Sequence, residues 1–272
     1  MTKYRQAPLV ELVAELRWNL PSITAFPPGF EPPSGVVPTN FPFFGHDQGK
    51  LEAFVSAFSE ACFKGGIQSV ERLMPPGFPI TVGQVSTRMR KSPTSPELYQ
   101  VGPGVFTANA IPPYDSWSAF SPFLNDGIEM LLQSRIEGER DLPFSAVSLQ
   151  YVDAFSTNLT RGMPAAKFMR DVLGFGIDAP SAILGLVAEG TEVNSNLQMT
   201  AVLGDGLSLN LSLGEGVANN TSAIIMQTNI VALKPVEPSV EAVLSILHSA
   251  QRAQHTIFQG VIKSIEDRME PY

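Results

Sequence analysis

Few side chains in this chain have a type and spacing that could carry out chemistry. Glu11 and Glu15 share one side of an N-terminal segment with Arg17, and paired carboxylates of this kind could line a cleft as acid and base. A solvated or salt-bridged outer face explains the same charges, and we favour it. His248 and His255 lie two helical turns apart, about 10 Å along the axis, too far for both to bind one metal ion.

Motifs for nucleotides, metals and nucleophilic catalysis are also missing. Residues 45–51 resemble a phosphate-binding loop but are one residue short, with Leu51 in place of the magnesium-binding hydroxyl. Three glycine pairs (102/104, 204/206 and 214/216) lack the third glycine of a dinucleotide site. The single cysteine, Cys62, lies in an apolar helical stretch, so we expect a buried structural thiol. The sequence therefore predicts no cofactor, no metal ion and no catalytic residue.

Composition limits the partners. The apolar fraction of 44% and the charged fraction of 16% are typical of a folded protein. A net charge of −8 argues against nucleic acid, whose phosphates require Lys and Arg, and leaves room for a basic protein partner. No apolar run approaches the roughly 20 residues of a membrane span, and residues 1–6 lead into a strand instead of a signal peptide. We expect a cytoplasmic protein by elimination.

The charged pair near the N-terminus lies on an expected strand, residues 8–18, whose apolar and polar positions alternate. A proline-rich loop follows at residues 21–45, with seven prolines between Pro21 and Pro42. This loop either packs on the body of the protein through its aromatic rings or is an arm that docks a partner. Its phenylalanines are the residues we consider for partner binding, together with Glu11 and Glu15: Phe26, Phe30, Phe41, Phe43 and Phe44.

The remaining elements repeat one order. Helices are expected at 47–63, 116–136, 165–173 and 239–269, and strands at 80–90, 97–102, 105–111, 144–155, 181–189, 196–203, 207–213 and 222–233. The fold class is therefore α+β, with two successive halves of strand, helix, antiparallel sheet and helix, residues 1–143 and 144–272. This order resembles a TATA-binding-protein-like or helix-grip arrangement. Whether the halves share one continuous sheet is left open.

Several short blocks resemble a sporadically distributed family of bacterial proteins of unknown function. They are Tyr4-x-x-x-Pro8-Leu9-Val10-Glu11, the segment from Gln100 to Gly102 with Asn109, Tyr114, Trp117 and Phe120, and His255-x-Ile257-Phe258. The chain departs from that pattern at Ala7, where a proline is usual, and at residues 149–153, where relatives tend to carry an Arg and an Asn. The resemblance implies no enzyme activity, and the family's patchy distribution suggests toxin–immunity pairs or phage-defence islands.

Three functions remain open. The first is a non-catalytic interaction protein, such as an immunity factor or defence component that neutralises a basic toxin or effector domain. The second is a binder of a small apolar ligand, held between the sheet and the long C-terminal helix. The third is an enzyme of unknown class that uses Glu11, Glu15, Arg17 or His255 in a cleft.

Overall fold

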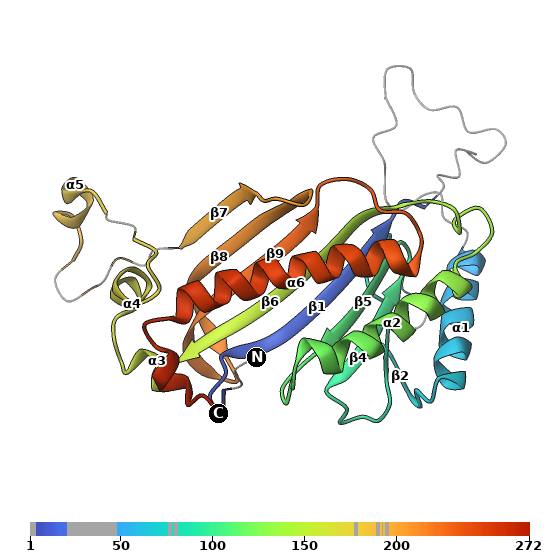
Figure 1. The fold of residues 1–272 in the computed structure, drawn as a ribbon, viewed down its shortest axis with the longest axis horizontal. Helices are drawn as coiled ribbons and strands as arrows, with labels where there is room; N and C mark the ends of the chain where they lie inside the picture. The colour runs from blue at the N-terminus through green and yellow to red at the C-terminus, as the bar shows by residue number, and fades with distance from the viewer. Residues whose placement is uncertain are drawn as a thin grey trace, which may run out of the picture.

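Among the residues that the structure describes, nine strands form one antiparallel sheet (Figure 1). The computed structural model describes residues 4–20, 48–75, 78, 81–176, 179–188, 191, 193 and 196–272. The strands are β1 (Leu9–Trp18), β2 (Ser69–Arg72), β3 (Thr87–Arg90), β4 (Glu97–Gly102), β5 (Val105–Ala110), β6 (Phe144–Ser156), β7 (Leu197–Val202), β8 (Leu207–Ala218) and β9 (Thr221–Ala232). They lie in the order β2-β3-β4-β5-β1-β6-β9-β8-β7.

The two halves of the chain share this sheet. The first strand of each half, β1 and β6, are antiparallel neighbours at its centre, and Leu12 of β1 pairs with Tyr151 of β6 and with Ala110 of β5. The predicted α+β class and its antiparallel strands are therefore confirmed, and the sheet is continuous. The likeness to a TATA-binding-protein or helix-grip fold, and the division at residue 143, stay predictions.

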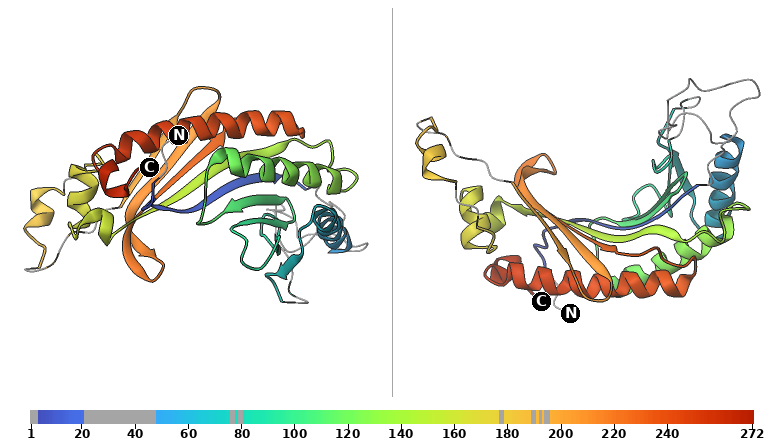
Figure 2. Two further views of the ribbon diagram at one scale, coloured as in Figure 1. Left: turned by 60° about the horizontal axis from the view of Figure 1, so that its bottom comes forward. Right: turned by 90° about the horizontal axis from the view of Figure 1, so that it is seen from above.

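Alternation along β1 decides which face of the sheet is covered. Leu12, Ala14 and Leu16 are fully buried on one face, whereas Glu15 and Arg17 point to the other. The buried face packs against α1 (Gln48–Lys64), α2 (Trp117–Ser134) and α6 (Val240–Ile262). Figure 2 shows α2 and α6 on the same side of the sheet.

Each of the two longest helices begins at a serine cap. The Ser116 hydroxyl accepts a hydrogen bond from the Ala119 amide at 3.2 Å, and the Ser239 hydroxyl accepts one from the Ala242 amide at the same distance. Such a cap supplies an acceptor for an amide that has no partner within its helix. Of the helices within the described ranges, none has both the length and the apolar character that a bilayer span requires.

Three predicted elements need correction. Residues 181–189 were expected to form a strand, but Ser181–Leu184 form the short helix α5, because a short apolar run after a proline fits either structure. The last helix ends at Ile262 and is followed by a separate 3-10 turn, Glu266–Met269. The strand expected at 80–90 covers only Thr87–Arg90. Two short helices, α3 (Thr157–Thr160) and α4 (Ala165–Asp171), complete the second half.

Candidate functional site

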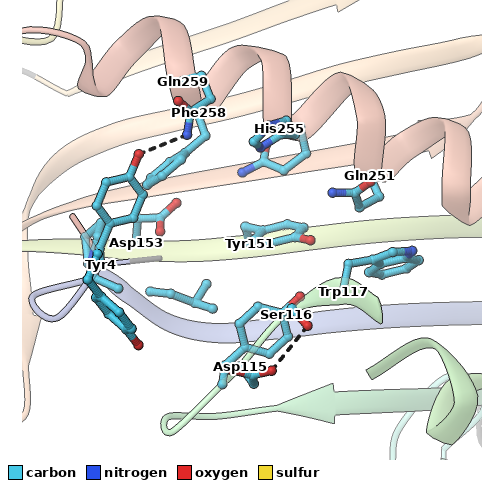
Figure 3. Close-up of a pocket in the computed structure, with 16 residues that line it drawn as sticks. Tyr4, Asp115, Ser116, Trp117, Tyr151, Asp153, Gln251, His255, Phe258 and Gln259 are labelled. Carbon is cyan, nitrogen blue, oxygen red and sulfur yellow. Dashed lines mark hydrogen bonds between the residues drawn. The ribbon is translucent and has the colours of Figure 1, made fainter. Parts of the chain in front are cut away.

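A pocket of about 170 Å³ lies between α6 and the centre of the sheet (Figure 3). It is formed by the N-terminal segment, β6, the loop between β5 and α2, α6 and the C-terminal tail. Sixteen residues line it. They are Tyr4, Ala7, Pro8, Leu9, Tyr114, Asp115, Ser116, Trp117, Tyr151, Asp153, Gln251, Gln254, His255, Phe258, Gln259 and Tyr272.

Hydrogen bonds between the two ends of the chain close one side of this pocket. The Tyr4 hydroxyl donates to Glu266 Oε1 at 2.9 Å and accepts from Gln259 Nε2 at 3.2 Å, the contact drawn in Figure 3. The amides of Arg5 and Gln6 donate to carbonyls of residues 270 and 269. The tyrosine ring is thereby held in a fixed place at the pocket wall.

Asp153 is the most unusual group in the pocket. It projects from β6 opposite Leu9, where a bulge interrupts the pairing of β1 with β6, and is only 2% exposed. Its Oδ2 atom has no hydrogen-bond partner. Because burial disfavours the charged form, the pKa of the Asp153 carboxyl is raised from 3.8 to about 7. Bulges often re-aim side chains beside functional sites.

Three more buried oxygens without partners lie on the elements around this carboxylate, and one of them, Asn229 Oδ1 on β9, belongs to a residue that pairs in register with Gln150 and so lies toward the other face of the sheet. Gln254 of α6 lines the same pocket, is 3% exposed, and has an unpartnered Oε1 atom. Thr228 of β9 pairs with Tyr151 of β6, is fully buried, and has an unpartnered Oγ1 atom. Native proteins pair the large majority of such atoms with protein groups, water or a ligand. The region under α6 therefore offers hydrogen-bond acceptors that the described residues do not use.

Aromatic rings form much of the remaining wall. Tyr114 and Tyr151 both line the pocket, and burial raises the pKa of both phenols. The Trp117 ring meets the His248 ring edge-on at 5.7 Å, and His248 Nε2 lies 3.3 Å from the Ser121 hydroxyl. His248 is thus occupied on the outer side of this wall. The aromatic rings offer flat apolar surfaces close to the polar groups of Asp153 and Gln254.

The charges singled out in the sequence lie on the opposite face of the sheet. Glu15 forms a salt bridge to Arg17 with a shortest distance of 2.7 Å, and Glu11 accepts a hydrogen bond from the Asn109 amide at 2.7 Å. His255 instead lines the pocket. The structure does not bring these four residues into one cleft, and the third alternative, an enzyme that uses one of them, stays untested. A role of Glu11 and Glu15 in partner binding stays a prediction.

The remaining residues singled out in the sequence lie outside the pocket or outside the described residues. Phe26, Phe30, Phe41, Phe43 and Phe44, with the whole loop 21–45, lie outside the described residues. Cys62 is a buried free thiol, and burial raises its pKa to about 12, as expected for a structural cysteine. The described part of the chain brings together no group of three or more His, Cys, Asp or Glu side chains able to hold a metal ion.

Two buried polar residues of the pocket, Asp153 and Gln254, were not predicted as site residues, although they leave a signal in the sequence. Asp153 shares its strand face with Leu149 and Phe155, at a position where another apolar residue would continue the pattern. Gln254 interrupts the buried stripe of α6 after Leu247 and Ala250. A polar residue at a core position of both a strand and the helix that covers it marks a site between them.

Comparisons with protein-family models, with curated proteins and with solved structures find no match. Membership of the sporadically distributed bacterial family therefore stays a prediction. The pocket does contain residues from every block on which that resemblance was based, although the blocks are far apart in the sequence. From the opening come Tyr4 and Pro8, from the middle Tyr114 and Trp117, and from the last helix His255 and Phe258.

Proposed function

We propose that this protein binds a small molecule in the pocket under α6. The observation that carries the proposal is the buried Asp153 carboxylate, which faces a cavity and has an oxygen without a partner. An unpaired buried polar group costs about 1–3 kcal/mol, so folding alone gives no reason to keep it. A ligand that donates a hydrogen bond to it would offset that cost.

The size of the pocket sets the size of the ligand. A cavity of about 150 Å³ accommodates one benzene molecule, and this pocket, at about 170 Å³, is slightly larger. A ligand of about six to ten non-hydrogen atoms therefore fits. The alternative drawn from the sequence, a purely apolar ligand, agrees with the location between sheet and helix but leaves the acceptors of Asp153 and Gln254 unpaired.

A blocking variant tests the proposal. Ala7 lines the pocket and its own side chain is exposed, so Ala7→Trp should fill the entrance without disturbing the core. Ala57→Trp, on the exposed side of α1, is the matched control. Native mass spectrometry of gently purified protein should show a retained small molecule in the wild type and in Ala57→Trp but not in Ala7→Trp. Absence of any retained mass in the wild type contradicts the proposal.

The interaction role expected from the sequence remains a second proposal, as does a cytoplasmic location. The interaction role is supported by a cluster of exposed apolar side chains on and after α5: Ile183 (51% exposed), Leu184 (53%) and Leu186 (88%). If a basic partner docks there, the double variant Leu184→Ser/Leu186→Ser should lose the partner when the two are co-purified. Val217→Ser, at a similarly exposed site on β8, should retain it.

A further inference from the structure

The charges that line the pocket are unbalanced. Its sixteen residues include two carboxylates, Asp115 and Asp153, and no Lys or Arg. A third carboxylate, Glu266, lies just behind the wall as the acceptor for Tyr4. Among the lining residues only His255 has a basic side chain, and Arg5 lies at the pocket edge against Tyr272. An anionic ligand would enter beside both carboxylates, and close like charges in a buried site are costly. The electrostatics therefore favour a neutral or positively charged ligand.

The polar atoms of the pocket favour a positively charged ligand over a neutral one. The unpartnered atoms of Asp153 and Gln254 are acceptors, so the ligand must carry donors that reach both elements. An ammonium group has three N–H donors and no acceptor. It also neutralises the carboxylate, which a hydroxyl does not, and a charge-assisted hydrogen bond is about twice as strong as a neutral one.

The aromatic wall fits the same chemistry. Six of the lining residues are aromatic: Tyr4, Tyr114, Trp117, Tyr151, Phe258 and Tyr272. The faces of Tyr and Trp rings attract a cation, more strongly where water is excluded. The chain already uses this contact at the pocket edge, where the Arg5 guanidinium lies 5.8 Å from the centre of the Tyr272 ring.

Resting on the proposed function, we infer that the ligand is a small primary or secondary amine bound in its protonated form. Its ammonium group donates to Asp153 on the sheet and to Gln254 on α6, and its carbon skeleton lies against the tyrosine and tryptophan rings. Burial raises the pKa of Asp153 in the empty pocket, and an adjacent ammonium ion would lower it again. Binding thus completes an ion pair of which the protein supplies one half.

Three ligands of similar size and different charge test this inference: benzylamine, benzyl alcohol and benzoate, titrated calorimetrically at neutral pH. Benzylamine should bind at least about tenfold more tightly than benzyl alcohol, and benzoate should bind most weakly. Asp153→Asn should remove the preference for the amine while keeping the affinity for the alcohol. Asp126→Asn, on the exposed side of α2, should change neither. Circular dichroism confirms that each variant is folded, and the wild-type ranking tests the inference without any variant.

The outcomes separate this inference from the proposed function. Equal affinity for amine and alcohol, or tightest binding of benzoate, contradicts a cationic ligand but leaves small-molecule binding in place. A retained native ligand without a basic nitrogen also contradicts a cationic ligand and leaves small-molecule binding in place. A retained ligand with a basic nitrogen supports the inference. If none of the three ligands binds and the purified protein retains no small molecule, both proposals are wrong.

Discussion

Replacing Asp153 with Asn should make the free energy of unfolding less dependent on pH. Asparagine keeps the shape of the side chain but cannot ionise. In the ligand-free wild type, the carboxyl has a pKa of about 7, compared with 3.8 as its ordinary value. At 1.36 kcal/mol per pKa unit, this separation is worth about 4 kcal/mol.

The sign follows from proton binding. Between about pH 4 and pH 7 the folded protein holds a proton on Asp153 that the unfolded chain has lost, so wild-type stability falls as the pH rises. The stabilising contribution is complete below pH 3.8 and lost by about pH 7, above which this group adds no further slope. The stability of Asp153→Asn relative to the wild type should therefore rise by about 4 kcal/mol from about pH 4 to pH 8.

Urea unfolding followed by tryptophan fluorescence measures this difference. Both proteins are first refolded from denaturant to release any bound molecule. A constant offset of about 1–3 kcal/mol, from the new amide donor, would leave the predicted slope unchanged. Asp126→Asn serves as the exposed control and should run parallel to the wild type. Parallel curves for Asp153→Asn and the wild type would refute the argument, because they mean that Asp153 titrates alike in the folded and unfolded chains.

Four other substitutions test the packing of the sheet and its helices, each by urea unfolding. Thr228→Val should stabilise the ligand-free protein by about 1–2 kcal/mol, since it removes a buried hydroxyl whose oxygen has no partner; a loss of stability would mean that the hydroxyl is bonded. Gly127→Ala should destabilise by about 1–3 kcal/mol, because its new methyl group would lie 2.5 Å from Tyr99 Cε1, whereas Gly260→Ala, in open space on α6, should stabilise by about 0.5–1 kcal/mol; equal effects would contradict this account of α2 packing. Arg135→Ala should destabilise by about 3 kcal/mol, since the fully buried guanidinium lies over the rings of Trp18 and Phe144, at 5.2 and 5.0 Å; a change below about 0.5 kcal/mol would show that these contacts add little.

Much of the fold can be predicted because strand and helix patterns are local. The alternation along β1 and the hairpin of β7 and β8 are visible in the sequence, and so is most of α6. Locality also explains the failures. Residues 181–184 form a helix in which the apolar Ile183 and Leu184 are exposed. Their hydrophobicity therefore does not indicate a position in the core, as the strand prediction assumed. The strand β2 was missed because its four residues are mostly exposed and show no apolar alternation.

The candidate site could not be assembled in the same way. Tyr4, Tyr114, Asp153 and His255 are far apart along the chain, and only the pairing of β1 with β6 under α6 brings them together. Of the residues considered for catalysis, only His255 lines the pocket, and the others, Glu11, Glu15 and Arg17, are charges of β1. Those charges lie on the face of the sheet away from α6, whereas the pocket depends on single polar residues within apolar stripes.

The central place of β1 also has a consequence for synthesis on the ribosome. Leu12 must wait for Ala110 to be translated before one edge of its strand can pair, and for Tyr151 before the other edge can. At about 5–20 residues per second, this delay is roughly 5–30 s. During that time a nascent segment of high β-propensity has at least one edge free, a state prone to aggregation. Glu11, Glu15 and Arg17 place three charges along it, and such gatekeeper charges oppose intermolecular pairing until the partner strands emerge.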